Sequence, residues 1–353
     1  MLDLDQVADL QAVVDPPAVT LLLRNDLPDR SARLDALIAE AEARLSLELE
    51  TAEVTARIRR LVELAETVDE DRGQQAIALF ASAGHAAASR LPEAVSDRVV
   101  VDDTFATRDL VRAHLRSPSY LALVLGDPGA RLFRGRGRVL WELVDTWFPV
   151  VDRDPETTER GRRHDPGIER DRRRARLVRE IDLGLEGPLR EVAGPLFVLG
   201  PRERVTGFVS ASRHAKAVAG DVPRGLPRHV SPGVVSTLVW PEIETWLAGR
   251  QAAAVEEVES AAGARRLATG VDEIWPLARD GRGDLLVVEE GFALTVRVDG
   301  DRLDVAEDAT TPGVVDDIVD EVIEAVMTQG GRVVIVADRA LEQRGRIAMK
   351  LRY

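Results

Sequence analysis

The chain contains no cysteine among its 353 residues. Disulfides, thiolate zinc sites and cysteine nucleophiles are therefore excluded, and a metal would have to be held by histidine and carboxylate ligands. The five histidines are scattered and form no His-x-x-x-His pair of the kind that a helical metal site uses. They are His85, His114, His164, His214 and His229. We therefore expect neither a metal nor another cofactor.

Long apolar stretches are also missing. No run approaches the roughly 20 apolar residues that a transmembrane helix needs. The first residues, Met1–Asp5, lack the basic start of a secretory signal peptide. The sequence therefore predicts a cytoplasmic protein without membrane contact, and its 45% hydrophobic and 31% charged residues are typical of a globular chain.

The length of 353 residues exceeds what one hydrophobic core comfortably serves and suggests two or three domains. The formal net charge of -14 is a second constraint. A negative body opposes broad, non-specific attraction to nucleic acid, because phosphate neutralisation is a long-range electrostatic effect. Only a local basic patch could overcome this opposition.

The first part of the chain, residues 1–116, has the pattern of an α/β domain. An amphipathic helical segment extends from Ser31, its expected N-cap, to about Val68. Three short apolar runs predict buried strands: Val19–Leu23, Ala76–Ala81 and Arg98–Val101.

Residues 117–236 form a second unit that begins with a hairpin pattern. Tyr120–Leu125 and Ala130–Gly135 are strand-like runs joined by a turn at Gly126–Gly129. The helix expected next has apolar residues at helical spacing, which are Leu177, Ile181, Leu185 and Leu189. Pro195–Gly200 then reads as a short buried strand.

Residues 237–353 form a third unit. A long helix is expected from Val239 to about Ala264, followed by a strand at Asp284–Val288. Val314, Ile318, Val322 and Val326 mark a further helix before two terminal strands. Strands that alternate with helices in all three units predict an α/β fold with mixed sheets flanked by helices.

The end of the chain carries the most specific pattern. The apolar run Arg332–Val336 is followed by a loop and by the terminal sequence Gly345-Arg346-Ile347-Ala348-Met349-Lys350-Leu351-Arg352-Tyr353. A buried strand, a variable loop and such a closing strand resemble the end of the archaeo-eukaryotic release factor and Pelota family. The residues that carry this match are Gly345, Ile347, Ala348, Leu351, Arg352 and Tyr353.

The resemblance extends over nearly the whole chain and indicates the bacterial branch of the family. The second strand of the middle unit resembles an Ala-x-Leu-Phe-x-Gly strand of the family at Ala130, Leu132, Phe133 and Gly135. Gly283–Glu290 resembles the strand that opens the family's C-terminal domain. The resemblance implies three α/β domains in the family's arrangement, at residues 1–116, 117–236 and 237–353.

One departure from the family pattern concerns catalysis. Members that release peptides present a Gly-Gly-Gln loop at the tip of the middle domain, but here the segment reads Arg160-Gly161-Arg162-Arg163-His164-Asp165-Pro166-Gly167-Ile168-Glu169-Arg170. The Gly-Gln step at Gly73-Gln74 precedes a strand of the first unit and is better explained as a turn. We therefore expect no catalytic residue and no peptide hydrolysis by the family's route.

What the tip contains instead is arginine, concentrated at about residues 152–179. Guanidinium groups pair with phosphates and stack on bases, so the family position makes this tip a candidate RNA contact. The candidate residues are Arg160, Arg162, Arg163, His164, Arg170, Arg172, Arg173, Arg174 and Arg176. The other interpretation is a solvated helix face, on which Glu169 and Asp171 pair with arginines three or four positions further on.

Other residues imitate known sites without completing one. His164-Asp165 is an adjacent acid/base pair with no nucleophile nearby, and Ser210, His214 and Asp221 lack the Gly-x-Ser-x-Gly elbow of a hydrolase. Gly135-Arg136-Gly137 and Gly281-Arg282-Gly283 lack the rest of a phosphate loop and are expected to be turns. The tryptophans are expected to pack in cores or between domains; they are Trp141, Trp147, Trp240, Trp246 and Trp275.

Three hypotheses about function follow. The resemblance implies a ribosome-associated factor that binds the A site, contacts ribosomal RNA and tRNA, and acts in ribosome hibernation or stalled-ribosome recognition. It also implies a translational GTPase as a partner of the C-terminal domain. A second hypothesis is a peptidyl-tRNA hydrolase in which His164, Asp165 or Glu169 replaces the glutamine. A third is a protein-interaction scaffold that has left the ribosome, favoured by the acidic charge and by the lack of a complete motif.

Overall fold

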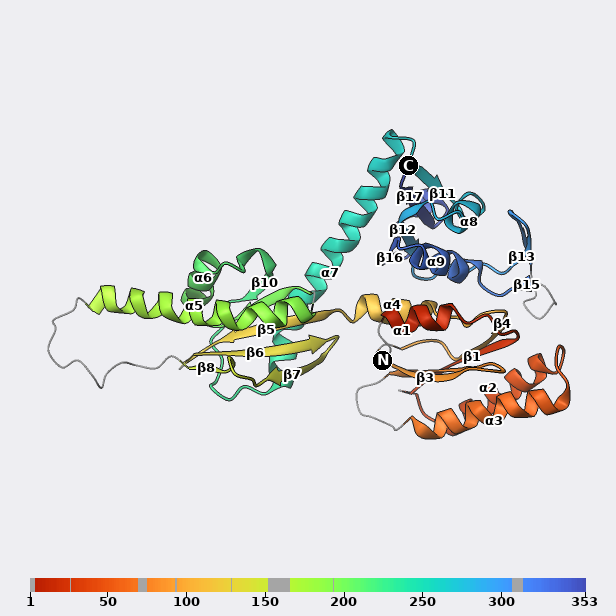
Figure 1. Cartoon of the computed structure of the whole chain (residues 1–353), viewed down its shortest axis with the longest axis horizontal. Helices are drawn as coiled ribbons and strands as arrows, with labels where there is room; N and C mark the ends of the chain where they lie inside the picture. The colour runs from red at the N-terminus through yellow and green to blue at the C-terminus, as the bar shows by residue number, and fades with distance from the viewer. Residues whose placement is uncertain are drawn as a thin grey trace. The chain divides into compact units, whose positions relative to one another are not determined.

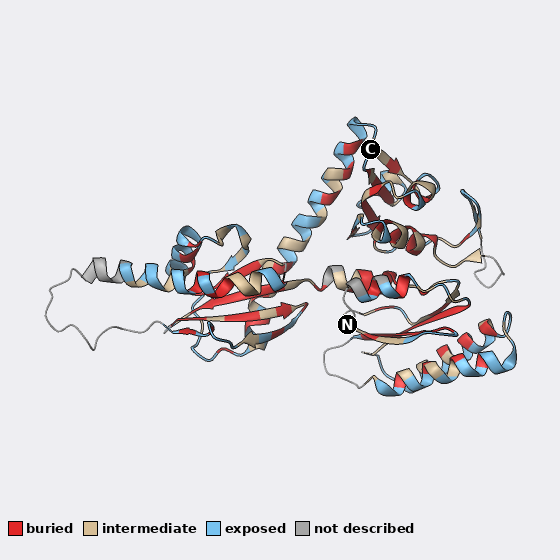
Figure 2. Cartoon of the chain, in the orientation of Figure 1, coloured by how far each residue is buried: buried red, intermediate tan, exposed pale blue. Residues whose placement is uncertain are grey.

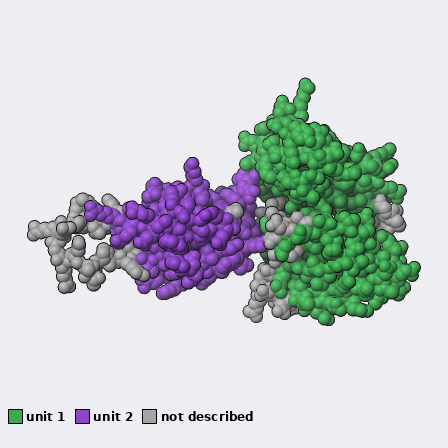
Figure 3. All heavy atoms as spheres, in the orientation of Figure 1, with its two compact units in different colours: residues 1–115, 251–353 green, residues 116–250 purple. Residues whose placement is uncertain are grey.

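The computed structural model describes residues 4–25, 27–68, 75–92, 94–127, 129–151, 166–192, 194–306 and 314–353. The chain divides into two compact units, which Figure 3 colours separately. Unit 1 comprises residues 1–115 and 251–353, and unit 2 comprises residues 116–250. Within the described ranges, no helix is long and apolar enough to cross a membrane.

Unit 1 contains two groups of elements (Figure 1). The N-terminal group is α1 (Leu4–Gln11), β1 (Ala18–Arg24), α2 (Arg30–Leu45), α3 (Thr51–Thr67), β2 (Ala76–Ala81), β3 (Ala86–Leu91), β4 (Arg98–Asp102) and α4 (Arg108–Arg116). The C-terminal group is β11 (Leu267–Thr269), α8 (Val271–Arg279), β12 (Gly283–Glu289), β13 (Val296–Asp299), β14 (Arg302–Val305), β15 (Val314–Val315), α9 (Ile318–Thr328), β16 (Arg332–Val336), the 3-10 turn η2 (Glu342–Arg344) and β17 (Ile347–Leu351).

The N-terminal sheet has the order β3-β2-β1-β4, and its strands pair antiparallel. Alternate residues of β1 serve opposite faces, because successive side chains of a strand point to opposite sides. Leu21 and Leu23 pack with α2 and α3, whereas Leu22 joins a second core with α1, α4 and the C-terminal group. Figure 2 shows the buried stripe of α2 and α3 against this sheet.

The C-terminal sheet has the order β11-β17-β12-β16 and mixes two pairings. β12 runs parallel to β16 and antiparallel to β17. Leu286 and Val288 of β12 face the core that contains α8 and α9, and Leu285 and Val287 face the C-terminal part of α7 (Pro232–Gly263). The three short strands β14-β13-β15 form a separate small sheet, which no sequence pattern predicted.

The closing motif of the sequence has a structural explanation in this sheet. Gly345 adopts a left-handed backbone with φ 72°, which glycine tolerates best, and the strand β17 then runs through the middle of the sheet. Ile347 and Ala348 are fully buried. Arg352 donates from Nε to the carbonyl of Gly283 over 2.9 Å and from Nη2 to the carbonyl of Gln329 over 2.6 Å. The motif therefore fastens the end of the chain to two other elements.

Unit 2 is built on one six-stranded sheet with the path β10-β9-β5-β6-β7, on which β8 pairs with β6. Its elements are β5 (Ser119–Leu125), β6 (Gly129–Arg136), β7 (Val139–Leu143), β8 (Val150–Val151), α5 (Pro166–Val192), β9 (Leu196–Leu199), α6 (Arg202–Ala211), the 3-10 turn η1 (Ala215–Ala217), β10 (Val218–Val222) and the first part of α7. β9 lies parallel to both β5 and β10.

The two faces of this sheet are covered by different helices. Leu121, Leu123 and Leu125 of β5 pack with α5 and α6, and the intervening Tyr120, Ala122 and Val124 pack with α7. Full burial of one leucine side chain contributes roughly 1.5–3 kcal/mol, so both faces stabilise the unit. The expected α/β fold with mixed sheets flanked by helices is confirmed.

Four expectations about the elements need correction. Val314 was expected to mark the helix of Ile318, Val322 and Val326, but it lies in β15, and α9 begins at Ile318. The segment from Ser31 to Val68 is two helices, since α2 ends at Leu45 and α3 begins at Thr51. The cause is visible in the sequence, because Leu45, Leu47 and Leu49 alternate instead of following helical spacing, and Leu47 is exposed. Ser31 lies inside α2, whose N-cap is Asp29. The helix expected from Val239 begins seven residues earlier, at Pro232. The division into three domains at residues 116 and 236 stays a prediction.

Candidate functional site

The arginines predicted to contact RNA belong to unit 2. Arg172, Arg173, Arg174 and Arg176 lie in the N-terminal half of α5, where Arg173 is half-buried and the other three are exposed. Arg179 is exposed as well. Arg172, Arg176 and Arg179 follow one another at four and three residues, so they share one side of the helix. We call this side the arginine face of α5.

The other candidate residues of the tip lie outside this description. Arg160, Arg162, Arg163 and His164 are not among the described residues, and the same holds for Asp165. Arg170 lies within α5, but its side chain is not described. The structure therefore places four of the nine candidate side chains, and it brings those four onto one helix.

One ion pair of α5 among the described residues reaches a neighbouring helix. Arg174 pairs with Glu203, which belongs to the neighbouring helix α6. The pairs expected along α5 from Glu169 and Asp171 involve side chains that are not described. Arg174 therefore joins two helices of unit 2, and the arginine face beside it remains exposed to solvent.

The charge of the chain is divided unevenly between the two units. Unit 2 carries 23 Lys and Arg against 18 Asp and Glu, and unit 1 carries 24 against 43. The net charge of unit 2 is therefore +5, whereas that of unit 1 is -19. The negative total of -14 thus says little about unit 2, whose positive charge lies where the sequence predicted RNA contact.

Two tryptophans lie at the surface of unit 2, contrary to the expectation that they pack in cores or between domains, whereas Trp240 and Trp246 pack against its core. Trp141 is 42% exposed and Trp147 is 50% exposed, whereas Trp275 of unit 1 is buried. Trp141 alternates with the buried Leu140 on β7, which is an edge strand of the sheet. The sequence contained a signal for this exposed strand face, namely large apolar residues at Val139 and Trp141 that alternate with Leu140 after an arginine-rich strand. Our expectation for the tryptophans did not use this signal.

The strand β6 is held in place by a paired arginine and a tight packing contact. Arg131 donates to both carboxylate oxygens of Glu142 over 2.7 and 2.6 Å, and these bonds hold the pKa of Glu142 below its ordinary value. A Cβ atom at Gly135 would lie 2.3 Å from the ring of Tyr120. Burial raises the pKa of the Tyr120 hydroxyl, which donates to the carbonyl of Gly137 over 3.1 Å. The glycine of the Ala-x-Leu-Phe-x-Gly pattern is therefore required by packing.

The residues that resemble parts of a hydrolase triad or of phosphate loops do not form such sites. Ser210 donates to the carbonyl of Thr206 within its own helix, and His214 Nε2 lies 3.1 Å from the carbonyl of Asp182. Asp221 lies on β10, and no hydrogen bond among the described residues links it to the other two. Gly137 and Gly281 adopt left-handed backbones in turns two residues before β7 and β12, whereas Gly135, Arg136 and Gly283 lie in strands, so the expectation of turns is confirmed only in part. No group of three or more carboxylates and histidines in the described part of the chain could hold a metal ion.

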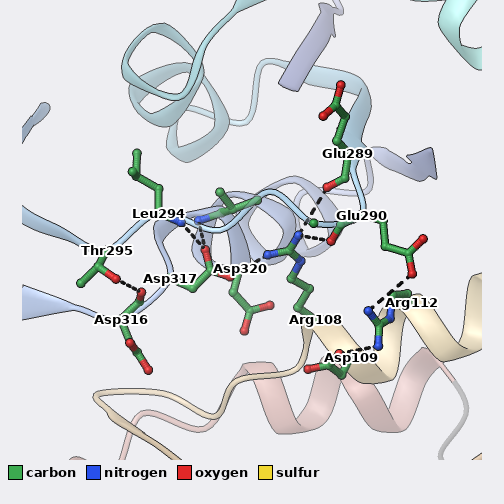
Figure 4. A network of polar contacts seen from close by, with 12 residues as sticks. Arg108, Asp109, Arg112, Glu289, Glu290, Leu294, Thr295, Asp316, Asp317 and Asp320 are labelled. Atoms are coloured by element: carbon green, nitrogen blue, oxygen red, sulfur yellow. Dashed lines mark hydrogen bonds and ion pairs between the residues drawn. The ribbon is translucent and has the colours of Figure 1, made fainter. Parts of the chain in front are cut away.

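A second polar region lies in unit 1, where α4 meets the C-terminal group (Figure 4). Arg108 Nη1 donates to Asp317 Oδ2 over 2.8 Å, and its Nη2 donates to the carbonyl of Glu290 over 2.8 Å. One turn along α4, Arg112 lies 3.0 Å from Asp109 and 3.6 Å from the carboxylate of Glu290. These contacts link the two groups of unit 1 and give the network a structural role.

Carboxyl groups of α9 beside this network favour their neutral forms. Burial, followed by the charges of Asp317 and Glu321, raises the pKa of Asp320 well above its ordinary value. Burial likewise raises the pKa of Glu321 to about 7 and that of Glu324 to about 8. Unit 1 therefore retains protons on this helix at a pH where ordinary carboxyl groups have lost theirs.

Comparison with known families supports the resemblance drawn from the sequence. Residues 119–282 match the sequence model of bacterial archaeo-eukaryotic release factor family 3. This stretch contains the arginine face of α5 and all of β5, β6 and β7. Comparison with curated protein sequences finds no match.

Comparison with solved structures finds matches that include three translation-related proteins. An archaeal Pelota in a model of ribosome-bound Pelota and ABCE1 is 14% identical over 99% of this chain and 94% of that chain, with a TM-score of 0.43. Dom34 of S. cerevisiae, described as a translation termination-like factor interacting with Hbs1, is 12% identical over 78% and 80%, with a TM-score of 0.41. The archaeal translation termination factor aRF1 is 16% identical over 99% and 96%, with a TM-score of 0.26.

Proposed function

Residues 119–282 belong to the bacterial branch of the archaeo-eukaryotic release factor family, and from this premise we propose that the protein is a cytoplasmic, ribosome-associated translation factor. It binds the ribosomal A site without hydrolysing peptidyl-tRNA, in ribosome hibernation or in the recognition of stalled ribosomes. The observation that carries the proposal is the exposed arginine face of α5, within the matched stretch.

The uneven charge supports ribosome binding through unit 2. Ribosomal RNA attracts arginine through charge and through bidentate pairing with phosphate. Unit 2 has a net charge of +5, and its exposed arginines Arg172, Arg176 and Arg179 lie on one side of a helix. We expect the protein to bind with unit 2 against RNA and the acidic unit 1 further from phosphate. This orientation gains attraction for the arginines and avoids repulsion of the carboxylates.

The acidic unit 1 suits a protein partner better than RNA. Its 43 Asp and Glu against 24 Lys and Arg would repel phosphate and attract a basic protein surface. We assign to this unit the contact with a translational GTPase or another ribosomal protein. A scaffold that acts away from the ribosome would use the same surface, so ribosome binding is the property that separates these two functions.

The absence of Gly-Gly-Gln from the sequence supports a non-hydrolytic role. A water must be positioned at the peptidyl-tRNA ester for hydrolysis, and the family does so with glycines and one amide side chain. The alternative nucleophile-positioning residues, His164, Asp165 and Glu169, are tested by alanine substitution in a peptidyl-tRNA cleavage assay. We expect no cleavage by the unaltered protein, and release of peptide that these substitutions abolish would show a hydrolase instead.

Co-sedimentation with 70S ribosomes over a series of salt concentrations tests the proposal. The unaltered protein should sediment with ribosomes, and its affinity should fall steeply as salt rises, because binding releases counterions from RNA. The Arg172→Glu/Arg179→Glu variant should bind at least ten times more weakly. Its slope against the logarithm of salt should be lower by about 2, one for each lost phosphate contact.

A matched variant controls for the change in net charge. Arg279→Glu/Arg302→Glu reverses two arginines of unit 1 that are 50% and 76% exposed. We expect this control to bind like the unaltered protein. If the two variants weaken binding equally, the arginine face is not the contact, and if the unaltered protein binds no ribosome in any state, the scaffold function replaces the proposal.

A further inference from the structure

Unit 2 exposes four large apolar side chains on β7 and on the loop that follows it. We call this set the tryptophan face, and it consists of Val139 (52% exposed), Trp141 (42%), Val144 (73%) and Trp147 (50%). Single exposed apolar residues are common on protein surfaces, but neighbouring large ones mark interaction sites. Two half-exposed tryptophans within seven residues therefore mark a candidate contact surface.

The fold holds both tryptophans in defined positions. Trp141 lies on the edge strand β7, where Val139 shares its side of the strand. Trp147 follows in a tight loop, because Asp145 Oδ1 accepts hydrogen bonds from the main-chain N–H of Trp147 over 2.7 Å and of Phe148 over 2.8 Å. The rings are thus presented by a rigid sheet edge and a hydrogen-bonded loop.

The tryptophan face adjoins α5, which carries the arginine face. A Cβ atom at Gly184 would lie only 3.0 Å from Trp147 Cβ and 2.8 Å from the ring of Phe148, so α5 packs directly on this loop. Gly184 is five residues beyond Arg179 and twelve beyond Arg172. At 1.5 Å per residue, these arginines lie about 8 to 18 Å further along the helix axis.

Arginine also lies within the tryptophan face itself. Arg134 of β6 is the direct cross-strand neighbour of Trp141, and its guanidinium carbon lies 6.0 Å from the centre of the indole ring. The carboxylates nearby are already engaged, since Glu142 is bound by Arg131 and Asp145 by main-chain N–H groups. The Trp141 ring and the Arg134 guanidinium are therefore close enough to contact the same ligand. Aromatic rings that stack on bases, together with arginines that pair with phosphates, are how proteins bind unpaired nucleotides.

We propose that the tryptophan face stacks unpaired bases of single-stranded RNA, while Arg134 and the arginine face of α5 bind the phosphates of the same strand. This inference deepens the proposed function, on which its ribosomal setting rests, by naming the kind of RNA that unit 2 recognises. A flat ring stacks on any base, so the site reads exposed bases and not a particular sequence. Base-paired RNA, whose bases are already stacked, binds more weakly.

Titration with a fluorescently labelled, unstructured RNA 12-mer at low salt tests the proposal on the full-length protein. The RNA should quench tryptophan fluorescence and gain anisotropy, and a duplex of the same length should bind at least tenfold more weakly. Removing a stacking ring costs about 5-fold to 150-fold in affinity for each base. Trp141→Ala and Trp147→Ala should each show a loss of this size, and Trp141→Phe/Trp147→Phe should stay within about threefold of the unaltered protein.

The control removes exposed apolar side chains from unit 1. Leu47→Ala/Val305→Ala alters residues that are 65% and 72% exposed, and its RNA affinity should not change. Unchanged affinity in Trp141→Ala/Trp147→Ala would overturn the proposal, as would a lack of binding by the unaltered protein. A monomer–dimer equilibrium that the tryptophan variants abolish, seen by analytical ultracentrifugation without any effect on RNA, would identify a second copy as the occupant and overturn it too.

Ribosome co-sedimentation of the same variants separates this proposal from the proposed function. The tryptophan variants could lose RNA 12-mer binding while neither they nor the unaltered protein bind ribosomes. That result would support the stacking site and reject the ribosomal role. Ribosome and RNA 12-mer binding that the tryptophan substitutions leave unchanged would retain the role and reject the stacking site.

Discussion

Arg108 and Asp317 form an almost completely buried ion pair within unit 1, with 2.8 Å between Nη1 and Oδ2 and side-chain exposures of 8% and 11%. Asp317 also caps α9, because its Oδ1 accepts a hydrogen bond from the N–H of Val319 over 3.1 Å. Arg108 starts α4, so one contact fixes the first turns of two helices (Figure 4). The N-terminal and C-terminal groups of unit 1 are joined by this pair.

Removal of the arginine should therefore be costly. Arg108→Ala leaves the Asp317 carboxylate buried without its partner, and we expect the free energy of unfolding to fall by about 3–5 kcal/mol. Urea unfolding, monitored through hydrogen exchange in peptides of α9, measures the change in stability of unit 1. The matched control is Arg302→Ala, whose side chain is 76% exposed and should change stability by about 0.5 kcal/mol or less. Equal effects of the two substitutions would show that the pair does not join the groups.

The stability of unit 1 should decrease as pH rises from about 5 to 8. Glu321 and Glu324 have folded-state pKa values of about 7 and about 8, above the ordinary 4.5. Between these values the folded state holds protons that the unfolded state has released, so the slope of unfolding free energy against pH is negative. Each proton contributes at most about 1.4 kcal/mol per pH unit. Urea unfolding at several pH values measures this slope.

Substitution of the two carboxyl groups should flatten that dependence. Glu321→Gln/Glu324→Gln replaces both with neutral groups, and the slope between pH 5 and 8 should become smaller. Glu257→Gln serves as the control, since hydrogen bonds from Arg332 and Lys350 lower the pKa of Glu257 to about 2, outside this range. Asp320 should leave a residual slope, because its pKa is raised as well, so a slope that stays unchanged in the double variant would show that Glu321 and Glu324 do not cause it.

Gly135 should tolerate no side chain. Gly135→Ala places a Cβ atom 2.3 Å from the buried Tyr120 ring, and overpacking of this kind costs about 1–3 kcal/mol. Hydrogen exchange in peptides of β5 reports the stability of unit 2. Gly126→Ala is the matched control, because no atom lies within 4 Å of its added Cβ. Comparable stability of the two variants would contradict the packing explanation of the family pattern.

Local patterns in the sequence predicted the helices and strands in which buried apolar residues recur at regular spacing. The β5–β6 hairpin, the strands β12, β16 and β17 of the C-terminal sheet and the apolar spacing at Ile181 and Leu185 of α5 all appear as expected. The small sheet β14-β13-β15 was not predicted, because its two- to four-residue strands are too short to show a period.

The candidate site was predictable only in part, for a physical reason. The arginine-rich segment was visible as composition, but the side of α5 on which Arg172, Arg176 and Arg179 lie depends on the phase of the helix against its sheet. The exposure of Trp141 depends on β7 being an edge strand, and strand order is a long-range property. The contact of Arg108 with Asp317 joins residues 209 positions apart, which local patterns cannot relate.

Cryo-electron microscopy of the full-length protein bound to 70S ribosomes tests the central claim most directly. We predict density in the A site, with the arginine face of α5 against ribosomal RNA or tRNA and the acidic unit 1 turned toward protein. Density at another ribosomal site, or α5 turned away from RNA within the A site, would contradict that claim.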